Sequence, residues 1–175
     1  DIAKNYIVAN ENTTVEQIVA DIRGGSVAVY NSKEYTVASG DAKKGNIVVV
    51  TSADGLMYRY IYVADSSEEA TAEMAFIQSY QVGYNSFGPK YYTDNIVSGE
   101  IIAAAYNKVN GEEQLEICNT CSVGNASYEY DGAHFIVTPA NRVDINIPSN
   151  ATKVKIFLWK DLSSCKPLAQ ESVAT

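Results

Sequence analysis

Residues 47–63 read IVVVTSADGLMYRYIYV, two runs of β-branched and aromatic residues joined by a short polar segment. The Asp54-Gly55 pair favours a tight hairpin turn, because both turn positions need a backbone conformation that few other residues adopt easily. The flanking runs, residues 47–51 and 57–63, are typical of β-strands. This stretch therefore predicts a β-hairpin in the N-terminal part of the chain.

Upstream of the hairpin, the spacing of apolar residues predicts one short amphipathic helix. The four residues of its apolar stripe are Val15, Ile18, Val19 and Ile22. Either Thr14 with Gln17, or Thr13 with Glu16, has the spacing of a capping box at its start. The glycines at 24–25 are expected to end it.

Strand-like runs at residues 5–9 and 27–30 complete the N-terminal pattern, so residues 1–65 are predicted to form a small α+β unit with one helix on a sheet. Residues 66–73, rich in acids and hydroxyls, are interpreted as a linker. Residues 74–175 are predicted to form an antiparallel β-sandwich of the immunoglobulin or fibronectin kind. Its expected strands are 74–82, 99–107, 114–118, 126–130, 134–138, 142–147 and 153–159.

Composition excludes several classes of function. The chain of 175 residues carries 13 Lys+Arg and 21 Asp+Glu, a net charge of -8 that would repel nucleic acid. No apolar run approaches the roughly 20 residues of a membrane span. With a single histidine and no nucleophile or phosphate-binding motif, we expect neither an enzyme nor a cofactor.

Several motifs resemble accessory modules of secreted polysaccharide-degrading and cell-surface proteins of clostridia and related bacteria. In the first part these are TVEQIV (14–19), VAVY (27–30), SGD (39–41), GNIVVVT (45–51) and residues 54–63; in the second, GEIIAAAYN (99–107), VKIFLW (154–159) and KPL (166–168). The resemblance implies non-catalytic modules of larger carbohydrate-active or wall-associated proteins, secreted or at the cell surface. The cysteines depart from that pattern, as do the tyrosines of residues 58–62.

The run 57–63 also predicts a binding surface. Because side chains alternate along a strand, three tyrosines fall on one face, opposite Ile61 and Val63. They are Tyr58, Tyr60 and Tyr62. A row of rings is expected to stack on sugars, with polar neighbours such as Asn31 or Glu34 fixing hydroxyls. The alternative is that this face packs against the second domain.

A second aromatic cluster lies in the segment between the strands predicted at 74–82 and 99–107, which we expect to be a long loop. Its proposed carbohydrate-binding residues are Tyr84, Phe87, Tyr91 and Tyr92, with the amides of Asn85 and Asn95. The alternative is a loop that folds its own aromatic rings over the open end of the sandwich.

The three cysteines leave three interpretations open. Cys118 and Cys121 have the spacing of a zinc or redox pair, and His134 and Cys165 would complete four zinc ligands. A disulfide between Cys118 and either Cys121 or Cys165 is the second possibility. Free thiols are the third.

Together these features predict a non-catalytic carbohydrate-binding region of a secreted or cell-surface bacterial modular protein. Its expected partners are plant or cell-wall polysaccharide and other modules of a larger chain, since the sequence starts at Asp1 without an initiator Met. The alternative function is a structural spacer or protein-interaction module of a surface protein or multi-enzyme complex. Exposure of the tyrosine rings would separate the two.

Overall fold

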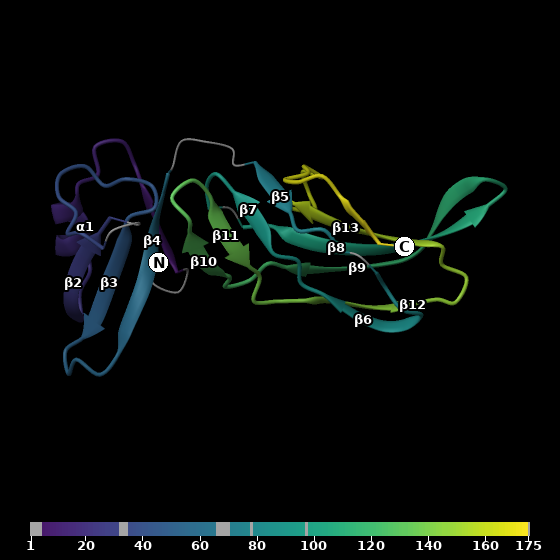
Figure 1. The fold of residues 1–175 in the computed structure, drawn as a ribbon, viewed down its shortest axis with the longest axis horizontal. Coiled ribbons are helices and arrows are strands. Elements are labelled where there is room, and N and C mark those ends of the chain that lie inside the picture. The colour runs from purple at the N-terminus through teal and green to yellow at the C-terminus, as the bar shows by residue number, and fades with distance from the viewer. Residues whose placement is uncertain (1–4, 32–34, 66–70, 78, 97, 175) are drawn as a thin grey trace. The chain divides into compact units, whose positions relative to one another are not determined.

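The computed structural model describes residues 5–31, 35–65, 71–77, 79–96 and 98–174 (Figure 1). The fold is mainly β, with one short helix packed on a four-stranded sheet, followed by several antiparallel sheets. The chain divides into two compact units. The first comprises Asp1–Ala70, Asp94–Ile96 and Tyr128–Ile136, and the second Thr71–Thr93, Val97–Ser127 and Val137–Thr175.

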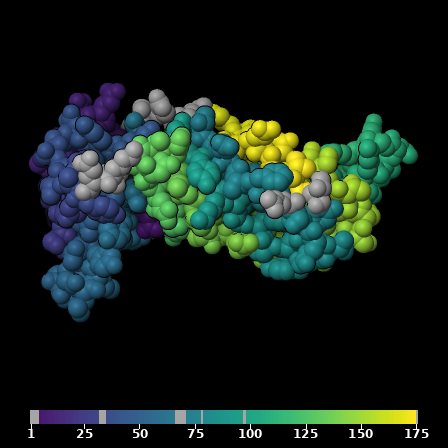
Figure 2. All heavy atoms as spheres, in the orientation of Figure 1, coloured from purple at the N-terminus to yellow at the C-terminus, as the bar shows by residue number. Residues whose placement is uncertain are grey.

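The first unit contains the predicted hairpin. Its elements are β1 (Tyr6–Ala9), α1 (Val15–Asp21), β2 (Gly25–Tyr30), β3 (Ile47–Ser52) and β4 (Tyr58–Asp65). The sheet has the order β1-β4-β3-β2; β1 runs parallel to β4 and the other pairs are antiparallel. The β3–β4 hairpin projects from the rest of this unit (Figures 1 and 2).

The helix begins as the sequence predicts, with Thr14 rather than Thr13 as the cap. The Thr14 hydroxyl accepts from the Gln17 amide at 3.2 Å, and the Gln17 side chain accepts from the Thr14 amide at 2.9 Å. This exchange satisfies two amide donors that have no partner inside the helix. The helix covers one face of the sheet, where the core consists of Ala9, Val15, Ile18, Val29, Ala38, Val48, Ile61 and Val63.

The second unit contains three groups of paired strands. Their bounds are β5 (Ala72–Met74), β6 (Gly83–Phe87), β7 (Tyr91–Thr93), β8 (Glu100–Val109), β9 (Glu112–Ser122), β12 (Val143–Ile147), β13 (Lys153–Trp159) and β14 (Ser172–Ala174). A sheet runs β14-β13-β8-β9, β6 pairs with β12, and β5 pairs with β7, all antiparallel. The strands β10 (Ser127–Tyr130) and β11 (Phe135–Thr138) are neighbours in a sheet.

Buried and exposed side chains alternate along β12, as its apolar and polar residues do in the sequence. Val143, Ile145 and Ile147 are buried and the two residues between them are exposed. The strand contacts β8 and β9, so its apolar face forms a core with the larger sheet. The strand predicted at 142–147 therefore has one wet and one buried face.

Two sequence predictions in the second unit are wrong. Of the strand predicted at 74–82, only Met74 lies in a strand, the end of β5. Residues 75–77 and 79–82 are not strand. In this segment the backbone makes hydrogen bonds that belong to no β-ladder. The Ile77 amide donates to the Ser172 hydroxyl at 2.8 Å, and the Ala75 amide donates to the Lys90 carbonyl at 2.9 Å. The predicted long loop contains β6 and β7, whose partners lie far away in sequence. Strand β14 was not predicted.

Of the predicted linker at 66–73, residues 66–70 lie outside the described residues, and β5 begins at Ala72. The first unit also takes in two short segments from beyond residue 74. In one of them, Asn95 is buried and ties the end of β4: its amide oxygen accepts from the Asp65 amide at 3.0 Å, and its amide nitrogen donates to the Asp65 carbonyl at 2.6 Å.

Candidate functional site

The first sheet has an outer face, opposite α1, on which the predicted tyrosines lie. Strand register arranges this face in rows across β4, β3 and β2. One row is Tyr62, Ile47 and Tyr30; the next is Tyr60, Val49 and Ala28; the last, nearest the hairpin turn, is Tyr58, Thr51 and Ser26. The sequence prediction that the three tyrosines of β4 share a face opposite Ile61 and Val63 is confirmed.

The first row is covered by residues of the same unit. The Phe135 ring meets the Tyr62 ring edge-on with centroids 6.2 Å apart, and Ile47 is only 3% exposed. On the neighbouring strand β1, Tyr128 meets Tyr6 edge-on at 5.7 Å. This row of the outer face is therefore covered.

Two tyrosines in these contacts, Tyr62 and Tyr128, have raised pKa values. Burial is the main cause, and it raises the pKa of Tyr128 to about 12 with a smaller contribution from Tyr6. Burial also raises the pKa of Tyr62, helped by nearby Tyr35 and by the Glu129 carboxylate. These hydroxyls are neutral near pH 7.

The other two rows are open, and we call their six residues the tyrosine patch: Ser26, Ala28, Val49, Thr51, Tyr58 and Tyr60. Tyr58 is 66% exposed and Tyr60 is 47% exposed. Their ring centroids lie 5.4 Å apart and the ring planes make an angle of 73°. The two rings therefore form a corner beside a floor of smaller side chains, rather than a flat shelf.

The patch combines aromatic, aliphatic and hydroxyl groups and contains no charged side chain. Both tyrosines and the side chains of Ser26 and Thr51 carry hydroxyls that can donate and accept hydrogen bonds. Because the floor belongs to β3 and to its partner β2 at the sheet edge, its geometry is fixed by the ladder and not by a loop. Such a surface suits an uncharged ligand with apolar faces and hydroxyl edges.

Of the two polar neighbours predicted for this site, the structure describes Asn31, whose side chain is bonded to other residues. The Asn31 amide donates to the Thr36 hydroxyl at 2.9 Å, and its oxygen accepts from Asn46 at 3.4 Å. Glu34 lies outside the described residues. The floor residues, by contrast, were missed from the sequence; strand alternation marks their face, but only the cross-strand register brings them beside the tyrosines.

The second predicted cluster does not converge on one surface. Tyr84 and Tyr92 are exposed, whereas Phe87 and Tyr91 are buried and offer no ring face to a ligand. The Asn85 amide nitrogen is used within its own turn, donating to the Gln81 carbonyl at 2.7 Å and to the Gly83 carbonyl at 2.9 Å. Asn95 is buried in the first unit.

All three cysteines are free thiols, so neither predicted disulfide is formed. Cys118 and Cys121 stand three residues apart on β9, and side chains at that spacing point to opposite faces of a strand. Burial raises the pKa of the Cys121 thiol. Cys165 donates to the Leu162 carbonyl at 3.3 Å, and His134 lies 3.9 Å from the Asp131 carboxylate. Among the described residues, no group of three or more potential ligands is arranged to hold a metal.

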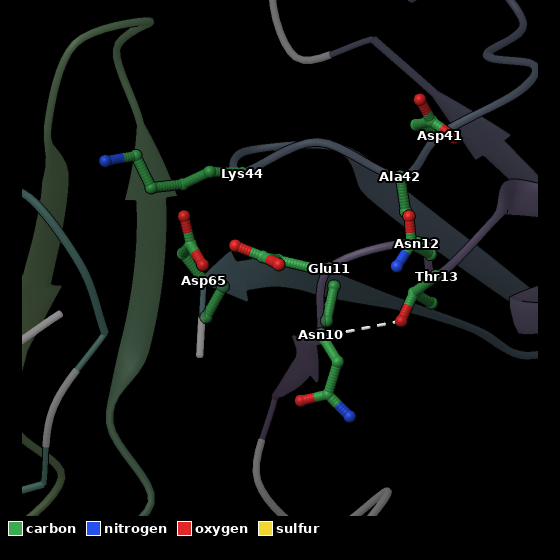
Figure 3. A pocket seen from close by; sticks show the side chains of 10 residues that line it. Asn10, Glu11, Asn12, Thr13, Asp41, Ala42, Lys44 and Asp65 are labelled. Carbon is green, nitrogen blue, oxygen red and sulfur yellow. Dashed lines mark hydrogen bonds between the residues drawn. The ribbon is translucent and has the colours of Figure 1, made fainter. Parts of the chain in front are cut away.

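A polar pocket of about 370 Å³ lies at the end of the first sheet where β1 and β4 finish. Its charged lining residues are Glu11, Asp41, Lys44 and Asp65. In Figure 3 the side chains of Glu11, Lys44 and Asp65 gather on one side and Asp41 lies apart from them. Mixed charges at a chain turn are a common solvated arrangement, and the pocket suggests no particular chemistry.

No known protein family matches the chain, and no curated protein matches it either. Across the part of the chain that the structure describes, none of the helical structure has the length and apolarity needed to cross a bilayer.

Proposed function

We propose that this chain is a non-catalytic carbohydrate-binding region of a secreted or cell-surface bacterial modular protein, and that the tyrosine patch is its binding surface. The observation that carries the proposal is the exposed corner of Tyr58 and Tyr60 beside a floor with two further hydroxyls. A sugar ring placed in this corner stacks its apolar face on one tyrosine and meets the edge of the other, while its hydroxyls bond to the floor.

Affinity electrophoresis in gels that contain neutral plant and bacterial wall polysaccharides tests this proposal. The native chain should be retarded, and the Tyr58→Ala/Tyr60→Ala double variant should lose at least tenfold in affinity, which corresponds to about 1.4 kcal/mol. Tyr84→Ala/Tyr92→Ala is the matched control, since it removes two exposed tyrosines from the second unit. Equal retardation of the native chain and both double variants would contradict the proposal.

The hairpin tip favours a second candidate function, a protein-interaction module. Leu56 is 82% exposed and Met57 is 68% exposed, directly before Tyr58. Methionine and tyrosine are enriched where proteins meet, and leucine adds apolar area. If the hairpin binds another module of the parent protein, Leu56→Ser/Met57→Ser abolishes that association and leaves glycan binding intact. Loss of glycan binding in this variant would instead place the tip in the carbohydrate site.

A further inference from the structure

The tyrosine patch is closed at one end along the strands. Tyr60, Val49 and Ala28 are followed, two residues along their strands, by the covered row of Tyr62, Ile47 and Tyr30. Phe135 packs on Tyr62, and Tyr35 lies against Tyr30 with ring centroids 6.3 Å apart. Because these aromatic side chains are larger than the Ser, Ala, Val and Thr side chains of the floor, a ligand that lies along the strands meets them as a wall.

The patch is also short. Two rows of one strand face span about 7 Å, and three strands span about 10 Å from the first to the third. Stacking at both Tyr58 and Tyr62 would extend the contact to about 13 Å along β4, but Tyr62 is engaged by Phe135. The floor therefore has room for one or two sugar rings.

The charges around the patch favour an uncharged ligand. Asp54 lies in the hairpin turn, where hydrogen bonds from the Ser52 hydroxyl and the Leu56 amide lower its pKa and keep it ionised. Glu129 lies near Tyr62 at the closed end. Together with the net charge of -8, these carboxylates oppose acidic polysaccharides.

We propose that the tyrosine patch binds the end of a neutral glycan chain, one or two terminal sugar units, and not an internal stretch. This inference rests on the proposed carbohydrate function. The wall of Tyr62, Tyr30 and Phe135 stops the chain, the Tyr58–Tyr60 corner holds the terminal ring, and the rest of the polymer leaves toward the hairpin turn or the β2 edge.

Calorimetric titration with a length series tests this inference. The probes are neutral 1,4-β-, 1,3-β- and 1,4-α-linked glucan oligosaccharides of two to six units, with a long soluble polymer of each linkage. For a linkage that binds, we express the Kd per mole of chain ends. This Kd should stay constant within about twofold from the trimer to the polymer. A Kd per mole of chains that falls in proportion to length shows internal binding and overturns the inference while the proposed function stands. Binding to none of the probes overturns both.

A substitution on the floor supplies the matched variant. Ala28→Tyr places a large side chain beside Val49 at a strand position that tolerates tyrosine, and it should lower affinity at least tenfold for every chain length. Val8→Tyr is the control, because Val8 is an exposed residue of β1 outside the patch. Both variants should keep the native urea midpoint. Unchanged affinity in a folded Ala28→Tyr variant would remove the floor from the site and overturn the inference.

Discussion

Glu113 shows how one exposed side chain can be held by its neighbours. Its carboxylate bonds to Lys153 through one oxygen and to Lys155 through the other, the second at 2.9 Å. Lys155 also lies over the Tyr106 ring at 5.1 Å. Hydrogen bonds from the two lysines lower the pKa of Glu113 from 4.5 to about 2. Glu113 lies on β9 and both lysines lie on β13, so this arrangement depends on strands that are far apart in the sequence.

The low pKa of Glu113 leads to a pH-dependent prediction. A carboxyl whose pKa is lowered by folding contributes stability that is fully present above its unfolded pKa and lost as pH falls through its folded pKa. The stability that Glu113 supplies should therefore be present above pH 4.5 and disappear toward pH 2. Glu113→Gln should lower the urea midpoint slightly at pH 7 and lose its effect near pH 2.

Urea titrations at several pH values measure this difference, with Glu112→Gln as the control. That variant removes a neighbouring charge but neither of the lysine contacts. A Glu113→Gln midpoint that tracks the native protein from pH 7 to pH 2 would show that the two ion pairs contribute nothing measurable.

The two faces of strand β4 differ in burial, so substitutions on them should differ in their effect on stability. Ile61 and Val63 are in the core beneath α1, while Tyr58 and Tyr60 are on the open outer face. Ile61→Ala should lower the free energy of unfolding by about 2–5 kcal/mol, since it leaves a cavity in that core. Tyr60→Ala should lower it by only about 1 kcal/mol, through lost strand propensity and the cross-strand pair with Val49. Chemical denaturation measures both, and a Tyr60→Ala variant as destabilised as Ile61→Ala would mean that the patch is not free surface.

The elements that could be predicted from the sequence are those with a strong local pattern. The helix, its cap and the β3–β4 hairpin follow from residues close to one another, and β13 begins and ends at the predicted residues. Strands β6 and β7 could not be predicted in this way. Their segment is rich in glycine and asparagine, and it becomes strand because β12 and β5 supply the hydrogen-bonding partners.

The candidate site, too, could be predicted only where a local pattern marks its residues. Alternation alone placed Tyr58 and Tyr60 on an outer face, but it could not show that Phe135, more than 70 residues away in the chain, covers Tyr62. It also could not show which loop aromatics are buried, because Tyr91 is fully enclosed while its neighbour Tyr92 is exposed. Burial of this kind depends on long-range packing, which no local pattern records.

At the scale of the whole molecule, the first unit is built from three separate stretches of chain. The later stretches supply the Asn95 bonds to Asp65 and the Phe135 ring on Tyr62. They also supply the Tyr130 ring at Gly45, where an added Cβ would come within 2.3 Å of the ring. A fragment of residues 1–70 lacks all of these contacts.

We therefore expect the 1–70 fragment to be much less stable than the same residues in the full chain, with Ile47 exposed and a tendency to aggregate. Hydrogen exchange of the β3 amides, compared between the fragment and the full chain, measures the loss of protection. Equal protection in the two would show that the sheet and helix are sufficient by themselves.

The interleaved chain of the first unit has a consequence for biosynthesis. At roughly 5–20 residues per second, the ribosome needs roughly 3–13 s to advance from residue 70 to residue 136. During that interval the nascent N-terminal sheet lacks the Phe135 ring that later packs on Tyr62. Chaperone demand and misassembly should peak in this window, and they should decline once residue 136 has left the exit tunnel.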